Sequence, residues 1–180
     1  MKHYIITRYN LKLYDRPDAE EWMRHRWRLF QRTKESILSQ QGEWEWVVLV
    51  DPRTPDEWRE RIGNTQTLFV APNEWYISTR IDNDDYYLAD DVFVQIQGKA
   101  QEQEMVIDID YYQECDEVFY TSERPTPNSP FVSLVDRGDW VYKRQHTHLA
   151  DGIPAVKLGV LAVMVIHDRN LANKLIGKKI

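Results

Sequence analysis

Three carboxylates crowd into four residues in the segment Asp82-Asn83-Asp84-Asp85, which directly follows the apolar, β-prone stretch 76–81. Negative charges this close repel one another unless something offsets them. Two carboxylates that converge on one point bind a hard divalent cation. Such a cation can also grip a diphosphate and neutralise the charge that grows on a departing nucleoside diphosphate. The Asp-x-Asp pattern therefore predicts metal-dependent chemistry on a nucleotide, with a solvated acidic turn as the structural alternative.

The neighbours of this turn favour the nucleotide interpretation. Arg80 lies just upstream, where a guanidinium can pair with phosphate. Asp51 ends another apolar stretch, and ligands of open α/β sheets bind at the carboxyl ends of the strands. We therefore expect Asp51 and the acidic turn to lie on one functional edge. The arginines Arg24, Arg26, Arg28 and Arg32 are interpreted as the solvated face of a helix.

Hydrophobic periodicity predicts the elements that must position these groups. Strands are predicted at 3–7, 45–51, 67–72 and 75–82, and helices at 16–42, 54–63 and 89–103. Further strands are predicted at 105–112, 116–123 and 159–167, with 105–112 half-buried and paired with 116–123 as a hairpin. Asp108 and Asp110 would then lie on a wet strand face, and His146 and His148 on another exposed strand face. This order predicts an α/β fold whose mixed, mostly parallel central sheet is flanked by helices.

Composition limits the classes of partner. The chain has 180 residues, which fits a single domain over 1–180. Its net charge of −6 argues against general attraction to nucleic acid or anionic membranes. The single cysteine, Cys115, excludes a disulfide framework, and the longest apolar run, 160–166, is too short to span a bilayer. We therefore expect a cytoplasmic protein without an integral membrane segment.

Four segments carry a resemblance to a known family. In order, they are YIITRYN, RWRLFQRTKESILSQQGEWEWVVLVDPRTP, STRIDNDD and HDRNL, and the resemblance extends from about His3 to Leu175. They resemble the rhamnosyltransferase family of glycosyltransferases, which has a shortened GT-A fold related to glycosyltransferase family 2. STRIDNDD is the most specific of the four. The resemblance implies that the chain is a single minimal GT-A domain.

The resemblance also implies a role for each matching residue. The residues that would border or contact the nucleotide sugar are Thr7, Arg8, Asn10, Asp51, Arg80, Asp82 and Asn83. Asp84 and His167 would coordinate Mn²⁺ or Mg²⁺. Asp136, in the segment PFVSLVD, would be the general base that takes the proton of the acceptor hydroxyl.

The implied activity is transfer of a sugar from a UDP- or dTDP-linked donor to a hydroxyl of a glycan acceptor, with rhamnose or another deoxysugar as the expected sugar. A base opposite the diphosphate would invert the anomeric centre, and its absence there would allow retention. The alternative is a catalytically inactive relative that acts as a carbohydrate-binding or assembly module. A third interpretation is a metal-dependent phosphodiesterase. The acceptor, the stereochemistry and the oligomeric state stay open.

Overall fold

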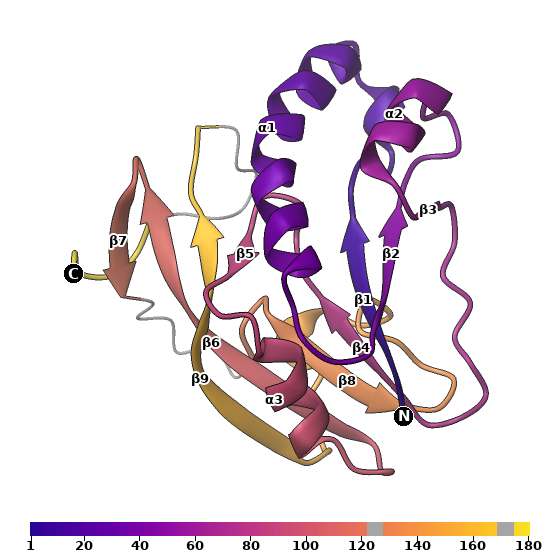
Figure 1. The fold of residues 1–180 in the computed structure, drawn as a ribbon, viewed down its shortest axis with the longest axis vertical. Coiled ribbons are helices and arrows are strands. Elements are labelled where there is room, and N and C mark those ends of the chain that lie inside the picture. The colour runs from indigo at the N-terminus through magenta and orange to yellow at the C-terminus, as the bar shows by residue number, and fades with distance from the viewer. Residues whose placement is uncertain (122–127, 169–174) are drawn as a thin grey trace.

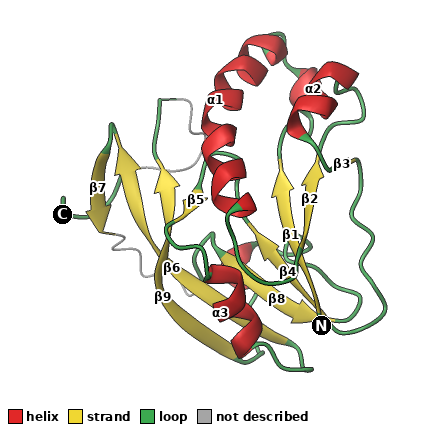
Figure 2. Cartoon of the chain, in the orientation of Figure 1, coloured by secondary structure: helices red, strands yellow, loops and turns green. Residues whose placement is uncertain are grey.

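The protein folds around one mixed β-sheet. The computed structural model describes residues 1–121, 128–168 and 175–180 (Figure 1). Within these residues nine strands form a sheet in the order β3-β2-β1-β4-β8-β6-β9-β5, and β7 pairs with β6. Figure 2 shows the helices packed in front of this sheet, with long loops joining the remaining elements.

The elements alternate between strand and helix in the first half of the chain. They are β1 (Lys2–Arg8), α1 (Ala19–Leu38), β2 (Glu45–Leu49), α2 (Asp56–Ile62), β3 (Thr65–Gln66) and β4 (Tyr76–Arg80). The second half contains β5 (Tyr86–Tyr87), α3 (Val92–Lys99), β6 (Met105–Cys115), β7 (Val118–Thr121), β8 (Val132–Asp136) and β9 (Ala155–Val165). Short 3₁₀ turns lie at Leu13–Asp15 and His146–His148.

Strand direction decides which residues meet at an edge of the sheet. β1 runs parallel to both β2 and β4. β8 is antiparallel to β4 and to β6, so β6 runs in the same direction as β4, and β9 runs parallel to β6. The carboxyl ends of β1, β2, β4, β6 and β9 therefore lie at one edge, which we call the carboxyl edge.

The two faces of the sheet are covered differently. On one face, the helix face, α1 packs its buried stripe of Met23, Phe30 and Ile37 into the main core together with residues of α2 and α3. On the other, the loop face, Tyr4, Ile6 and Tyr76 of the sheet pack against Phe69, Trp140 and Tyr142 from loops.

Strand alternation assigns neighbouring residues to opposite faces. Ile5 belongs to the core of the helix face and Ile6 to the loop face. In the same way Ile81 lies in the helix-face core, whereas the guanidinium of Arg80 lies 4.8 Å from the ring centre of Tyr142 on the loop face. The chain therefore delivers side chains to both faces as it leaves β4.

Several sequence expectations need correction. The sheet is mixed as predicted but not mostly parallel, because β5, β7 and β8 all pair antiparallel with their neighbours. Residues 67–72 form an extended loop instead of a strand, and His146 and His148 lie in a 3₁₀ turn instead of a strand. The hairpin of β6 and β7 is confirmed. No helix in the described residues is long and apolar enough to cross a membrane.

Strand β6 is more deeply buried than its alternating sequence predicted. It lies between β8 and β9 and is buried over most of its length. Asp108 is consequently only 2% exposed, and its Oδ1 accepts a hydrogen bond from the backbone N–H of Ser129 at 2.7 Å. Burial of a carboxylate requires such a partner. Asp110, in contrast, is exposed as expected.

Candidate functional site

The crowded carboxylates of the acidic turn each have a separate partner. Asp82 pairs with Arg80, whose Nη2 lies 3.2 Å from Oδ1 and 3.3 Å from Oδ2. Asp85 is almost fully buried, and its Oδ1 accepts the backbone N–H of Val165 at 2.9 Å. Burial raises the pKa of Asp85 well above its usual value, which favours the uncharged form of this carboxyl group. Repulsion among the three groups of the turn is thereby reduced.

Asp84 lies on the helix face, where two cationic or polar groups approach the same carboxylate oxygen. Arg26 of α1 forms an ion pair with Oδ2 of Asp84, and both side chains are 9% exposed. His167, which follows β9, places Nε2 3.0 Å from that oxygen. Burial alone would raise the pKa of Asp84, but the His167 hydrogen bond and the Arg26 charge outweigh it, so the pKa is lowered. Asp84 is therefore a carboxylate held in place from two elements.

Asn83 fixes the turn to the end of β1. Its side-chain Nδ2 donates to the carbonyl of Tyr9 at 2.5 Å and lies 3.3 Å from the carbonyl of Arg8. The side chain is therefore used to join two loops at the carboxyl edge. It positions the acidic turn and is itself only 6% exposed.

Asn10 and Asp51 join the loops that follow β1 and β2. Asn10 accepts the backbone N–H of Asp51 at 3.0 Å and donates to the hydroxyl of Thr54 at 2.9 Å. The carboxylate of Asp51 accepts the backbone N–H of Lys12 at 3.1 Å and both Nε and Nη2 of Arg53 at 2.9 Å. These bonds, led by the Arg53 side chain, lower the pKa of Asp51 to about 2. The sequence prediction that Asp51 lies on the edge is consistent with this placement.

Thr7 lies inside the sheet and not at a pocket wall. It is fully buried, and its hydroxyl accepts a hydrogen bond from Nε1 of Trp46 at 3.1 Å. In this structure Thr7 therefore has no exposed surface to offer a nucleotide, and its expected place at the border of the nucleotide pocket stays a prediction. Arg8, the next residue, is exposed and reaches the loop face.

Asp136 lies at the wrong edge for a general base. Because β8 runs antiparallel to β4, Asp136 at the end of β8 pairs with Tyr76 at the beginning of β4. Asp84 follows the other end of β4, so the length of this strand separates the two carboxylates. Asp136 instead accepts the backbone N–H of Asp139 at 3.1 Å and shapes the turn after β8. Its predicted catalytic role does not fit this geometry.

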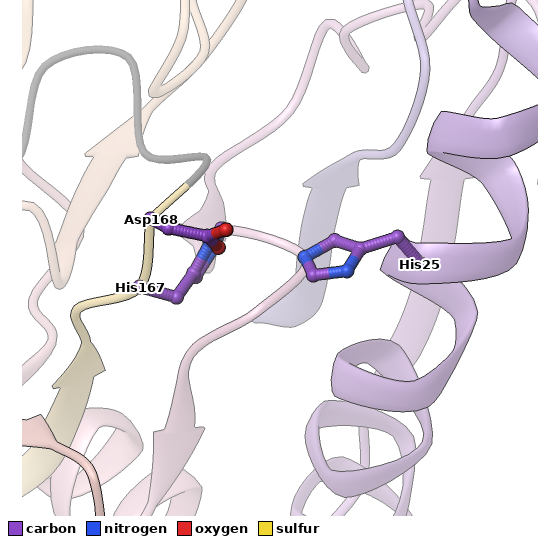
Figure 3. A group of neighbouring side chains, drawn as sticks. All are labelled: His25, His167 and Asp168. Atoms are coloured by element: carbon purple, nitrogen blue, oxygen red, sulfur yellow. The ribbon is translucent and has the colours of Figure 1, made fainter.

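A group with potential for metal binding lies beside the Asp84 cluster. Figure 3 shows His25 projecting from α1 towards His167 and Asp168, which follow β9. One ligand atom from each of the three residues lies within 4.8 Å of the others. Two ligands bound 2.1 Å from a tetrahedral metal are about 3.4 Å apart, so a modest closure is needed. Asp168, whose side chain is 83% exposed, has the room to provide it.

A basic hollow of about 410 Å³ lies on the loop face of the same edge. Its lining residues are Arg8, Arg80, Tyr142, Lys143, Arg144, Gln145, His146 and Thr147. The aromatic ring of Tyr142 lies below the guanidiniums of Arg8 and Arg80, at 4.2 and 4.8 Å from its centre. The segment 142–147 was not singled out as a binding element by the sequence.

The structure thus divides the predicted site residues between two faces. Asp84 and His167 meet on the helix face, whereas Arg8, Arg80 and Asp82 lie around the loop-face hollow. Sequence reasoning missed Arg26, since it assigned this arginine to a solvated helix face. A signal was available: Met23, Arg26, Phe30, Thr33 and Ile37 follow helical spacing on the buried stripe of α1.

Comparison with known proteins defines the fold class. No protein-family model matches this sequence, and no curated protein matches it. Among solved structures, several are similar to this chain in fold at low sequence identity. The finding supports the predicted GT-A-like fold in general terms and leaves the finer resemblance to rhamnosyltransferases as a prediction.

One of these structures is S. aureus TarS. Its structure of residues 1–349 in complex with UDP-GlcNAc has a TM-score of 0.50 and 13% sequence identity with this chain. The match covers 94% of this chain but only 60% of that chain. The structure of the same TarS region with UDP gives a TM-score of 0.48 and 10% identity, covering 92% of this chain and 61% of that one. At such identity the likeness concerns the fold alone.

Proposed function

We propose that the protein is a glycosyltransferase that uses a nucleoside-diphosphate sugar. The single observation that carries this proposal is the acidic turn at the carboxyl end of β4 in a GT-A-like sheet, with His167 brought to it from the end of β9. Ligands of open α/β sheets bind at this edge. The TarS neighbour was solved with UDP-GlcNAc, which supports a nucleotide sugar as the ligand class.

The loops after β1 and β2 would form the nucleotide side of the site. Asn10 and Asp51 hold these two loops together through buried hydrogen bonds. The Asp51 carboxylate already accepts hydrogen bonds from Lys12 and Arg53. We therefore propose that Asp51 acts on the ribose indirectly, by positioning the loop and the Arg53 side chain. UDP and dTDP are the candidate carriers. Rhamnose or another deoxysugar stays the proposed sugar, on the sequence resemblance.

We propose that a divalent metal binds beside His167. We propose that His25, His167 and Asp168 hold it, while Asp84 accepts a hydrogen bond from His167 and fixes the imidazole orientation. Mn²⁺ and Mg²⁺ are the proposed ions, with the Asp168 carboxylate as the ligand type that both prefer. When bound, such an ion supplies charge neutralisation for the leaving diphosphate. This arrangement changes the role proposed for Asp84 from direct ligand to positioning residue.

The acceptor hydroxyl also needs a group that takes its proton. Asp136 lies at the opposite edge, so we propose Asp82 in its place. Its side chain is 33% exposed, and its Oδ1 lies 3.2 Å from Nη2 of Arg80, which orients the carboxylate. Asp82 lies on the loop face of the turn, across from the His167 group, as a base opposite the leaving diphosphate would.

One observation favours a second candidate function. Asp84 is already neutralised by the buried guanidinium of Arg26, which lowers the attraction of this carboxylate for a dication. A non-catalytic module that binds a nucleotide sugar or carbohydrate would have this property. It would retain ligand binding without releasing a nucleoside diphosphate.

A thermal-shift panel with UDP, dTDP and their sugar conjugates, each with and without Mn²⁺, tests the proposal. A ligand at a hundred times its dissociation constant stabilises a protein by about 2.7 kcal/mol. For a domain of this size that is a rise in melting temperature of about 5–10 °C. His167→Ala should remove the Mn²⁺-dependent part, whereas His148→Ala, an exposed histidine, should not.

The chemical readout separates the candidate functions. Release of UDP or dTDP from the stabilising conjugate supports the enzyme, and binding without release supports the non-catalytic module. Cleavage of diphosphates that carry no sugar would instead indicate a phosphodiesterase. If no nucleotide and no conjugate changes the melting temperature with any divalent metal, the proposal is wrong.

A further inference from the structure

The basic hollow lies on the opposite face of the sheet from the metal-binding group. Arg80 and Arg8 reach it from the ends of β4 and β1 on the loop face, and the loop residues Lys143 and Arg144 complete it. His167 and Asp84 meet Arg26 of α1 on the helix face. The acidic turn lies between the two groups. A donor held beside His167 would therefore leave this hollow available for a second substrate.

The hollow has more positive than negative charge. Four basic residues line it, together with His146. The carboxylates that face them are Asp82 beside Arg80, Asp139 at 3.4 Å from Lys143 and 3.7 Å from Arg144, and Glu104 at 3.9 Å from Arg144. Lys143 and Arg144 are about half exposed or more, so these pairs contribute little and exchange readily for a ligand. Arg8 forms none of the ion pairs found in the described residues.

Arg80 places a largely buried positive charge at the wall of the hollow. It is only 7% exposed, yet its buried Nε has no hydrogen-bond partner within the described parts of the chain. A buried cationic donor without a full set of partners is costly. The net charge of the whole chain, −6, makes this local excess of basic residues a specific feature of one place.

Tyr142 holds the two arginines in position before a ligand arrives. Its hydroxyl lies 3.3 Å from the carbonyl of Ile6 and 3.5 Å from that of Ile81, which bridges the ends of β1 and β4. Arg8 and Arg80 lie against its ring. Fixing the donors in advance reduces the entropy that binding must otherwise overcome.

We propose that this hollow binds an anionic group, phosphate or carboxylate, on the sugar acceptor. The proposal rests on the proposed glycosyltransferase function and names the substrate class of its second subsite. A volume of about 410 Å³ lies in the range of small-molecule sites and accommodates one charged sugar unit. Arginine forks bind both phosphate and carboxylate through paired hydrogen bonds. The acceptor is thus an acidic or phosphorylated glycan, bound with its charge in the hollow and its hydroxyl near Asp82.

A matched ligand series tests the proposal by calorimetry on the full chain. Glucose, glucuronate and glucose 6-phosphate share one ring and differ in charge. We expect binding to strengthen in that order, and expect added salt to weaken the two anions but not glucose. Arg144→Glu and Lys143→Glu should each weaken glucose 6-phosphate at least about tenfold, since a charge-assisted bond contributes about 1.5–3 kcal/mol. Arg28→Glu, an exposed change of equal charge on α1, should leave it unchanged.

The donor measured in parallel identifies which substrate uses the hollow. Loss of glucose 6-phosphate binding in Arg144→Glu, with the UDP- or dTDP-dependent thermal shift intact, supports the acceptor assignment. If Arg144→Glu instead loses nucleotide binding, and the wild type binds none of the sugar anions, the hollow belongs to the donor diphosphate and the proposal is overturned. Equal affinity for glucose and glucose 6-phosphate in the wild type would also overturn it. Binding of the sugar anions without any nucleotide binding would overturn only the proposed function.

Discussion

The buried ion pair between Arg26 and Asp84 leads to a quantitative prediction. Both side chains are 9% exposed, so replacing one partner leaves the other as a buried charge. Such a loss costs about 3–5 kcal/mol. Asp84→Asn should therefore lower the free energy of unfolding by this amount, which corresponds to a fall in melting temperature of about 6–20 °C. Arg26→Met should cost less, because His167 still hydrogen-bonds Asp84 at 3.0 Å.

The double variant decides whether the pair acts as a unit. Arg26→Met combined with Asp84→Asn removes both charges, so its cost should be smaller than the sum of the single costs by at least about 1 kcal/mol. Urea unfolding at pH 7 of the wild type, both single variants and the double variant measures this coupling. Arg24→Met, on the exposed side of α1, is the control. Additivity within about 0.5 kcal/mol would refute the ion pair as described.

Three further predictions concern individual carboxylates. Because burial raises the pKa of Asp85 above its unfolded value, the folded state binds the additional proton, and wild-type stability should fall as pH rises from about 4. Asp85→Asn should flatten that decline in urea titrations, and an unchanged pH profile would contradict the raised pKa of Asp85. The pKa of Asp51 is lowered to about 2, so its contribution to folding stability is present above about pH 4 and is lost as the pH falls towards 2. Asp51→Ala should therefore reduce the loss of stability at acid pH. Asp136→Asn should leave donor turnover unchanged within about twofold, whereas Asp82→Asn should reduce it about 100-fold or more; the reverse pattern would restore Asp136 as the base.

Local sequence signals located the acidic turn correctly. An apolar β-prone run that ends in polar residues predicts a strand and the position of its end, and β4 does end at Arg80, two residues before Asp82. Helical spacing likewise predicted α1, and it contained the information that Arg26 shares a stripe with Met23 and Phe30. The sequence interpretation relied on the charge of Arg26 and not on its position along the helix. An arginine can be buried where a carboxylate pairs with it.

Contacts between distant segments could not be derived in the same way. The pairing of Asp84 with His167 and the meeting of Tyr142 with Arg8 and Arg80 depend on sheet order, which the sequence does not state. Asp136 shows the consequence most clearly. It ends a strand, as Asp51 follows one, but β8 is antiparallel and so carries Asp136 to the opposite edge.

The sequence by itself determined which groups are present: an acidic turn after β4, a histidine after β9 and aspartates at strand ends, since these follow from local periodicity. Only the tertiary structure decided which groups meet. Strand direction selects the edge at which a side chain lies, and alternation of side chains selects the face. Those two choices separate Asp84 and His167 from the basic hollow and remove Asp136 from the site.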